Sequence, residues 1–353
     1  MLSTRFTDTY GVRHPIAQAG MAFVGMTPDL AVAVCRAGGL GSIGVGLMPP
    51  PALKATIDAV RAGTDRAFNI NFITTLTDPA QIDVACAEHV PVVSFHWGHP
   101  ARARIDALHS AGVKVWEQVG SPDAARRAVE DGIDLVVAQG VEAGGHNFGT
   151  LPTMALVPLV VDAVAPAHVL AAGGITDGRG LAAALMLGAD GVWVGTRFVA
   201  TRESFAHPDY KARLVGARGA DTVRTHVFGR EMPGFNPMRV LRNRVVNEWN
   251  DRVDDIPGEA ARPLIGHVDL GGALDSIRRA VQRPGGRILG GQGMDLRRFS
   301  NFVPIASTTG DLEEMPLLAG QGVGLVHSVP TAAEVVTTMV AQAEQALASP
   351  RLS

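Results

Sequence analysis

The chain contains little cysteine, few aromatic residues and little charge. Of its 353 residues, two are cysteines, 5% are aromatic and 18% are charged. Cys35 and Cys86 lack the spacing of a metal or redox motif, so we interpret both as small core residues in a reducing compartment and expect no metal site. No run approaches about 18 uninterrupted apolar residues and the N-terminus has no apolar signal segment, which predicts a cytoplasmic chain without a membrane partner.

Basic residues are not concentrated in any part of the chain. The formal net charge is −3 and no basic run is sustained, which argues against a nucleic-acid partner. Arg239, Arg242 and Arg244 lie close together in a stretch with helical character. We interpret them as an exposed or ion-paired helix face.

Glycine and apolar residues are abundant: the chain has 41 glycines, and 46% of its residues are apolar. Eight short apolar runs alternate with helical runs over about the first 200 residues. The expected strands are residues 15–18, 41–45, 67–72, 92–95, 114–118, 135–139, 168–172 and 191–195. The expected helices are residues 27–37, 50–62, 78–88, 100–110, 121–131, 153–165, 177–187 and 331–347.

This alternation predicts the fold class. Repeated strand–helix units produce a parallel sheet, and eight units in about 200 residues favour closure. The predicted fold is therefore α/β, a (β/α)8 or TIM barrel. The alternation stops after Arg197, and the charge rises over residues 204–304. We expect residues 204–304 to form an inserted, mostly helical subdomain over the C-terminal face of a barrel built from residues 1–203 and 305–353.

Large apolar residues occur within the expected insertion. We expect them at its seam with the barrel, or alternatively in a small core of its own. These residues are Phe228, Phe235, Met238 and Trp249. A glycine-rich segment, residues 319–324, follows the insertion and is expected to return to the C-terminal face.

The most informative stretch follows the sixth expected strand. Residues 139–149 read Gln-Gly-Val-Glu-Ala-Gly-Gly-His-Asn-Phe-Gly. Glycine has no Cβ, so the backbone here can approach a ligand closely, and Gln139 can both donate and accept hydrogen bonds at a ring edge. His146 therefore lies where a planar ligand can rest against bare backbone. The alternative is a tight loop with a surface histidine.

The seventh and eighth strands both run into glycine. One ends in Gly173-Gly174 and the other in Gly195-Thr196. The loops after these two strands often build a phosphate site in (β/α)8 barrels, because glycine turns expose N–H donors; ordinary turn chemistry is the alternative. A Gly-x-Gly-x-x-Gly pattern at residues 39–44 follows a helix and runs into a strand. Dinucleotide binding needs the reverse order, so we reject that interpretation.

Five segments resemble, in order, the motifs of the nitronate monooxygenase family, formerly called 2-nitropropane dioxygenases. They are residues 15–21, 68–72, 139–146, 171–175 and 194–198. Members of that family are FMN-dependent (β/α)8 barrels. FMN-dependent enoyl-ACP reductases and NADH:quinone reductases share this barrel and the Ala-Gly-Gly-His sequence. The resemblance is therefore more specific for the cofactor than for the substrate.

The resemblance implies roles for individual residues. His146 would be the catalytic histidine over the flavin. At the end of the fourth strand, where the sequence departs from the family, we expect His96 and Trp97 to line the substrate pocket. The residues implied to contact FMN are Met21, Ala22, Asn71, Gln139, Gly144, Gly145, Gly173, Gly174, Trp193, Val194, Gly195 and Thr196.

The implied activity is that of an FMN-dependent oxidoreductase, a nitronate monooxygenase that oxidises alkyl nitronates or nitroalkanes with O2. One alternative is an NAD(P)H-dependent reductase that passes hydride through FMN to a quinone or an enoyl thioester. Another is a flavin-binding or scaffold barrel without catalysis. The sequence departs from the family at Asn147-Phe148, where Arg-Gly or Pro-Gly is common. It also has two additional histidines, His96 and His99, whose alternative role is that of solvated loop residues.

Overall fold

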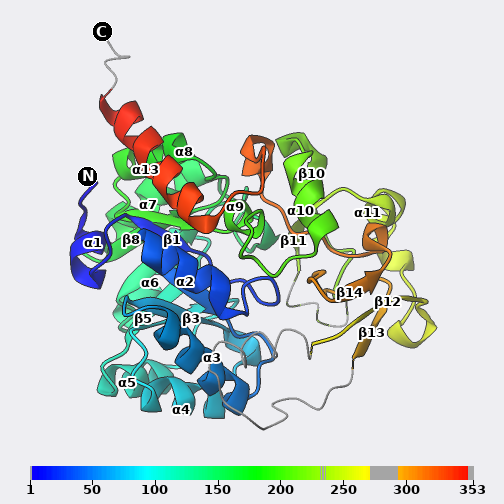
Figure 1. Ribbon diagram of the computed structural model, residues 1–353, viewed down its shortest axis with the longest axis horizontal. Coiled ribbons are helices and arrows are strands. Elements are labelled where there is room, and N and C mark those ends of the chain that lie inside the picture. The colour runs from blue at the N-terminus through cyan, green and yellow to red at the C-terminus, as the bar shows by residue number, and fades with distance from the viewer. Residues whose placement is uncertain (1, 231, 233, 235, 271–292, 349–353) are drawn as a thin grey trace.

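The computed structural model of the protein describes residues 2–230, 232, 234, 236–270 and 293–348 (Figure 1). Eight parallel strands form one sheet in the order β1-β9-β8-β6-β5-β4-β3-β2. Their bounds are β1 (Ile16–Gln18), β2 (Gly41–Gly44), β3 (Phe68–Ile73), β4 (Val92–His96), β5 (Lys114–Val119), β6 (Leu135–Gln139), β8 (His168–Ala172) and β9 (Gly191–Val194). Gln18 N donates to Leu40 O at 2.8 Å, which joins β1 to the chain entering β2 and closes the sheet. The predicted barrel is confirmed, and each expected strand lies within one residue of its observed bounds.

Helices cover the outside of this sheet. They are α1 (Arg5–Tyr10), α2 (Pro28–Ala37), α3 (Pro50–Gly63), α4 (Pro79–Ala87), α5 (Arg102–Ser110), α6 (Pro122–Glu130), α7 (Thr153–Val164), α8 (Gly178–Met186), α9 (Thr196–Val199) and α13 (Ala332–Ala348). The last helix returns to the barrel and packs against α8 and α2. A Cβ at Gly178 would lie 2.2 Å from Met339 O, so only glycine permits the close contact of α8 with α13. Among the described residues, no helix is long and apolar enough to cross a membrane.

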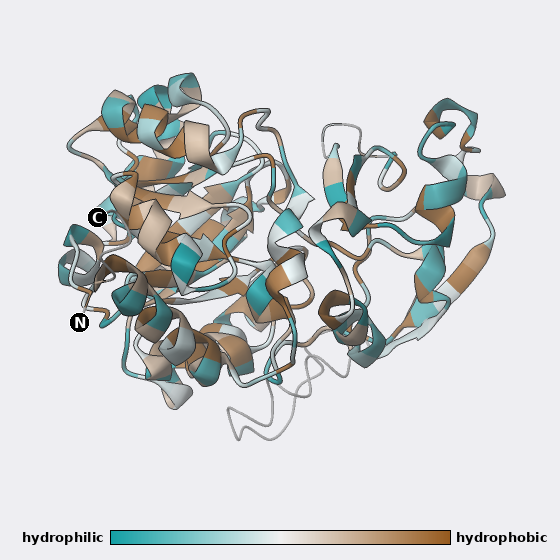
Figure 2. Ribbon diagram, turned by 90° about the horizontal axis from the view of Figure 1, so that it is seen from above, coloured by the Kyte–Doolittle hydropathy of each residue, from teal (hydrophilic) through white to brown (hydrophobic). Residues whose placement is uncertain are grey.

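Two apolar layers hold the barrel together. The larger one lies between the strands and the helices, and Figure 2 shows apolar residues along the barrel strands. The smaller one fills the barrel interior, where Phe6 and Tyr10 of α1 pack against Trp116 and Trp193. The indole of Trp116 donates to the Tyr10 hydroxyl at 2.8 Å, which satisfies both buried polar groups. Helix α1 therefore closes one end of the barrel, and the insertion lies at the opposite side (Figures 1 and 2).

The glycines of residues 39–44 have a packing role. This segment follows α2 and runs into β2, which is the order we expected when we rejected a dinucleotide-binding loop. A Cβ at Gly41 would lie 2.1 Å from Ala31 O, and one at Gly44 would lie 2.2 Å from Met21 C. Glycine at these positions lets the strand approach its neighbours.

The described residues of the insertion take part in two antiparallel sheets. Their strand orders are β10-β11-β7 and β13-β12-β14. The strands are β7 (Gly145–His146), β10 (Thr222–Thr225), β11 (Met238–Leu241), β12 (Leu264–Val268), β13 (Met294–Arg297) and β14 (Thr308–Gly310). Its α-helices are α10 (Pro208–Val215) and α11 (Arg244–Trp249). Short 3-10 helices are η1 (Thr74–Leu76) in the barrel, and η2 (Gly219–Asp221), η4 (Val253–Asp255), η5 (Glu259–Ala261), η6 (Leu312–Glu314) and η7 (Gln321–Leu325) in and after the insertion.

The expectation that the insertion is mostly helical is therefore wrong for its described residues. Each sheet takes a strand from outside residues 204–304: β7 comes from the barrel and β14 follows the insertion. Strand pairing of this kind depends on distant segments, so the local sequence pattern does not show it. The insertion boundaries at residues 204 and 304 stay a prediction. Strand β14 lies beyond residue 304 and pairs with β12 of the insertion, so this pairing crosses the second boundary.

The apolar residues expected at the seam lie in a core of the insertion itself. Phe228 and Met238 are fully buried there with Phe299, and Trp249 packs against the same cluster. This agrees with the alternative we gave for these residues. Phe235 lies outside the described residues.

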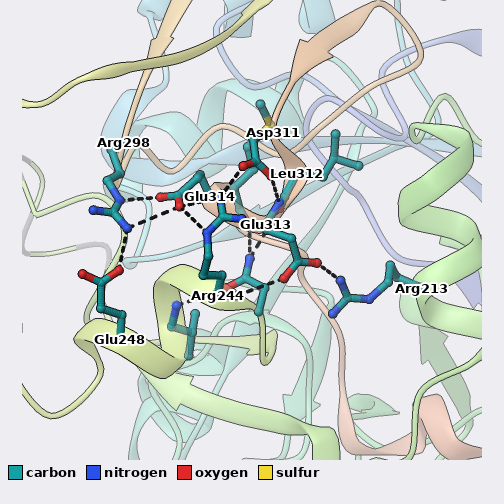
Figure 3. Close-up of polar contacts among 11 residues, drawn as sticks. Arg213, Arg244, Glu248, Arg298, Asp311, Leu312, Glu313 and Glu314 are labelled. Atoms are coloured by element: carbon teal, nitrogen blue, oxygen red, sulfur yellow. Dashed lines mark hydrogen bonds and ion pairs between the residues drawn. The ribbon is translucent and has the colours of Figure 1, made fainter.

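The arginines expected on one helix face are divided between two elements. Arg239 is a buried residue of β11, with 8% of its surface exposed, and this corrects its predicted helical position. Arg244 begins α11 and forms ion pairs, as expected for that residue. It donates to Asp311 and Glu314, and Arg298 contacts both Glu314 and Glu248 (Figure 3).

Glu314 is the shared acceptor of this network and is 7% exposed. We expect Glu314→Ala to lower the free energy of unfolding by about 1–3 kcal/mol, because it leaves two guanidinium groups without their common carboxylate. Urea unfolding of the purified protein measures this. Glu248→Ala is the matched control, because Glu248 is an exposed acceptor of the same Arg298 and should cost at most about 1 kcal/mol. Equal losses for the two variants would contradict the central position of Glu314.

Candidate active site

A cavity of about 280 Å³ lies at the C-terminal ends of the barrel strands. We call it the main cavity. Twelve of the residues predicted from the sequence line it: Met21, Ala22, His96, Gln139, Gly144, Gly145, His146, Gly173, Gly174, Trp193, Gly195 and Thr196. They lie at or after the ends of five barrel strands, far apart in the sequence, and barrel closure brings them together.

Three predicted residues are not part of its lining. Asn71 is buried beneath it and donates from Nδ2 to Ser94 Oγ at 2.7 Å. A Cβ at Gly20, which does line the cavity, would lie 2.1 Å from Asn71 Cβ, so Asn71 is separated from the cavity only by glycine backbone. Val194 packs into the strand–helix core, and Trp97 is buried behind His146.

The glycine turns leave room for a ligand. Gly173 and Gly174 have φ values of +107° and +71°, which non-glycine residues rarely adopt. A Cβ at Gly195 would meet only Ala19 Cβ at 3.7 Å and Met21 Sδ at 4.0 Å. The cavity wall is therefore bare backbone on this side, and a phosphate with its attached chain fits against it.

The segment after the insertion completes this wall. Gly320 N donates to Thr196 Oγ1 at 3.0 Å, and Thr176 Oγ1 donates to Gly322 O at 2.9 Å. Gly320 and Gly322 line the main cavity with Leu318. The glycine-rich segment 319–324 thus lies at the C-terminal face, between the histidine loop and the two expected phosphate turns.

His146 lies in a strand, whereas the glycine-rich pattern suggested a loop. It forms β7 with Gly145 and pairs with Met238 of β11. Asn147 N donates to Pro237 O at 3.2 Å, which extends the contact by one residue. The backbone that carries His146 is therefore fixed by the insertion.

Two arginines of the insertion hold the same loop, and the sequence did not reveal this role. Arg239 Nε donates to Val141 O at 3.1 Å, and Arg224 Nη2 donates to Asn147 O at 2.8 Å. Burial and the nearby Arg224 lower the pKa of Arg239 from its usual value, although a guanidinium keeps its charge at neutral pH. Carbonyl acceptors are the partners such a buried cation needs.

Aromatic rings enclose one side of His146. The Trp97 ring lies edge-on to the imidazole, with centroids 4.8 Å apart. On its other side Trp97 stacks with Phe148 at 3.8 Å, and its indole N–H donates to Gly234 O of the insertion. His146 is therefore held at the backbone by β11 and at the side chain by a ring that the insertion also contacts.

His96 presents a second imidazole to the main cavity. Its Nδ1 lies 3.0 Å from Phe72 O. A carbonyl oxygen only accepts, so Nδ1 carries the proton and Nε2 holds a lone pair. Burial and the nearby His146 lower the pKa of His96 to about 4, so this ring is neutral at neutral pH. His96 is a hydrogen-bond acceptor rather than a solvated loop residue.

Residues from distant segments also line the main cavity. Tyr210, Met232, Asn301 and Val303 come from the insertion, and Leu47 and Leu76 lie in barrel loops. None belongs to a sequence motif, and only the folded chain brings them together. Among the described residues, no group of three or more His, Cys, Asp or Glu could hold a metal ion.

The sequence model of the family described as Nitronate monooxygenase matches residues 3–83 and 73–342. The chain belongs to the nitronate monooxygenase family. It is 35% identical over 302 residues to a probable nitronate monooxygenase of Staphylococcus saprophyticus, covering 72% of this chain and 83% of that one. The chain is therefore an enzyme, as predicted, and family membership implies a flavin cofactor. Bare glycine backbone at Gly174 and Gly195 fits such a group.

Two other similar proteins match almost the whole chain. One is the (3aS,4S,5R,7aS)-5-hydroxy-7a-methyl-1-oxo-octahydro-1H-indene-4-carboxyl-CoA dehydrogenase of Rhodococcus jostii. It is 34% identical and the match covers 97% of this chain and 96% of the relative. The other is the structure of FabK from Thermotoga maritima, with 35% identity, a TM-score of 0.78 and 98% coverage of both chains.

Flavin occupancy tests the glycine wall. Gly174→Leu should place a side chain where the flavin phosphate is expected, and the flavin content of the purified protein should fall sharply. Gly195→Leu should do the same without the strain of a positive φ. Gly112→Leu is the control, because Gly112 has φ +76° and open space around it, in a turn far from the main cavity. Flavin absorbance per chain measures the result, and full occupancy in both cavity variants would contradict the assignment.

Proposed function

We propose that this chain is an FMN-dependent nitronate monooxygenase that oxidises alkyl nitronates and nitroalkanes with O2. The observation that carries the proposal is the pair of imidazoles, His146 and His96, in one cavity bounded by bare glycine backbone. The wall offers one phosphate site, at Gly174 and Gly195, which favours FMN over a dinucleotide flavin. Bound FMN supplies the electron transfer between the organic substrate and O2.

Met21, Ala22, Gln139 and Trp193 are the side chains proposed to hold the isoalloxazine ring. Gln139 presents an amide that can both donate and accept, which suits the alternating donors and acceptors of the ring edge. Its Nε2 lies 3.4 Å from His146 O, so the same amide lies beside the histidine strand. Asn71 is proposed to contact the ring past Gly20, with its amide oriented by Ser94.

His146 is the proposed acid–base residue. The carbon next to a nitro group is a weak carbon acid, and an imidazole that is neutral near pH 7 can take its proton. His96 has its proton on Nδ1, directed to Phe72 O, so its Nε2 can only accept a hydrogen bond inside the cavity. Because His96 is neutral, it does not oppose the positive charge that His146 gains when it accepts a proton.

The insertion is proposed to exclude water from the reacting atoms. Met232, Asn301 and Val303 line the main cavity from the insertion side, and Tyr210 is fully buried there. A site closed in this way strengthens electrostatic interactions and limits side reactions with solvent. The apolar side chains of the wall favour a substrate with a small polar head and an alkyl chain.

Replacement of the histidine tests the proposed mechanism. His146→Ala should keep the flavin, because backbone pairing with Met238 does not need the imidazole. Turnover of neutral nitroalkanes should fall by about 10²–10⁴-fold, the usual contribution of a positioned base, because a nitroalkane must still lose its α-proton whereas a nitronate has already lost it. His267→Ala is the matched control, because His267 is likewise a strand residue, in β12 of the insertion, yet does not line the main cavity. Wild-type kcat in His146→Ala on every active substrate would show that the imidazole is structural.

A second candidate function is a pyridine-nucleotide-dependent oxidoreductase acting on a thioester or a quinone. One observation favours it. The R. jostii CoA dehydrogenase and the T. maritima FabK structure match at least 96% of this chain and of their own length at 34% and 35% identity. The structure of a nitroalkane oxidase from Streptomyces ansochromogenes covers 97% of this chain at the lower identity of 29%. The insertion, which is part of those longer matches, is the region that meets the substrate side of the main cavity.

Anaerobic reduction distinguishes the two functions. If the chain is a monooxygenase, an alkyl nitronate should bleach the flavin absorbance, and NADH or NADPH should do so only slowly. If it is a pyridine-nucleotide enzyme, NADH or NADPH should bleach the flavin rapidly in the absence of a nitronate. Stopped-flow absorbance on the same holoenzyme sample gives both rates. Rapid bleaching by NADH or NADPH with none by a nitronate would overturn the first proposal.

A further inference from the structure

A second cavity of about 350 Å³ opens beside the main cavity, and we call it the side cavity. It lies at the ends of β4 and β5 and beneath the loop that follows His146. Gln118 lines both cavities, so the two are adjacent. No motif of the sequence points to it, and neither proposed function assigns it a ligand.

The side cavity contains a buried carboxylate. Glu117 is 2% exposed, and its Oε2 accepts a hydrogen bond from His99 Nδ1 at 2.7 Å. The other ring nitrogen of His99 lies 2.9 Å from Asp131 Oδ2. Both nitrogens of His99 therefore face carboxylates.

The second oxygen of Glu117 has no hydrogen-bond partner among the described residues. Glu117 lines the side cavity, so this oxygen can be satisfied from there. Burial raises the pKa of Glu117, which shows the cost of holding its charge away from water. A carboxylate oxygen in such a position requires an O–H or N–H donor. A ligand that presents hydroxyl or amine hydrogens to Glu117 would satisfy this oxygen.

Two other side chains restrict the ligand further. Phe148 is 49% exposed, and Trp97 covers one face of its ring by stacking at 3.8 Å. A flat ring can stack on Phe148 from the cavity side. Arg127 is exposed, and its guanidinium forms no hydrogen bond or ion pair with the residues that the structure describes. A guanidinium in this state suits a phosphate.

We propose that the side cavity binds a ribonucleotide, with its base on Phe148, its ribose diol on Glu117 and its phosphate on Arg127. A carboxylate is a common acceptor for ribose hydroxyls, aromatic side chains stack with bases, and guanidinium pairs with phosphate. An adenine nucleotide of this kind occurs in both pyridine nucleotides and coenzyme A. The side cavity would hold that part of the molecule while the reactive end enters the main cavity past Gln118.

Binding of AMP to the holoenzyme tests the proposal by calorimetry. Wild-type protein should bind AMP saturably, with a Kd below about 1 mM. 2′,3′-Dideoxy-AMP should bind at least about tenfold more weakly, the expected loss for hydrogen bonds to a charged acceptor. Glu117→Gln should bind AMP as weakly as wild type binds the dideoxy nucleotide, and it should not distinguish the two. The comparison of AMP with 2′,3′-dideoxy-AMP uses wild-type protein alone, so it tests the ribose contact even if Glu117→Gln does not fold.

The arginine has a matched control on the same helix. Arg127→Ala should weaken AMP binding about tenfold, whereas Arg126→Ala should not, because Arg126 is exposed and paired with Asp123. Absence of saturable AMP binding to wild type up to about 10 mM would overturn the proposal. Equal affinity of Glu117→Gln and wild type for AMP would also overturn it.

Competition identifies the source of the nucleotide. Displacement of AMP by NADH or NADPH and not by coenzyme A assigns the side cavity to a reductant, and the reverse result assigns it to a thioester substrate. These are binding measurements and do not depend on turnover. Failure of nitronate oxidation would therefore leave the nucleotide proposal standing, and failure of AMP binding would leave the nitronate proposal standing.

Discussion

Met238 of β11 lies opposite His146 of β7, and this short antiparallel pairing joins the insertion to the barrel where the proposed chemistry occurs. Hydrogen bonds between backbones are directional, so the pairing sets the direction of the histidine as well as its position. The same small sheet carries Arg239, which binds the loop before His146, and Arg224, which binds the carbonyl after it. The geometry of the site depends on the insertion as much as on the barrel.

The barrel imposes the other constraint: its backbone must lie close to a ligand at some positions and close to neighbouring elements at others. Glycines at the strand ends allow a ligand to lie against peptide groups, and the packing glycines of β2 let this strand approach α2 and the loop after β1. A Cβ at any of several of these positions would collide with a neighbouring main chain. The high glycine content noted in the sequence therefore has two separate causes, ligand access at one end of the strands and strand–helix packing along them.

Charge is distributed differently in the two cavities. The main cavity contains two imidazoles, and its His96 is kept neutral by burial and by the nearby His146. The side cavity contains a carboxylate and an imidazole in contact, with a second carboxylate beyond them. The apolar surroundings of the imidazoles in the main cavity suit a proton transfer near neutral pH. The hydrogen-bonded carboxylates of the side cavity suit recognition of a polar ligand.

The sequence by itself determined the barrel and most of the main cavity. Strand and helix periods are local, and glycine at a strand end has a local meaning, so the eight strands and residues such as Gly174 and His146 could be predicted. The sheets of the insertion could not, because β7 and β14 are supplied by distant segments. The roles of Arg224 and Arg239 and the side cavity at Glu117 were also decided only by the tertiary structure. Their partners are carbonyls and carboxylates that come together only when the barrel closes and the insertion docks on it, and such contacts leave no periodic trace in the sequence.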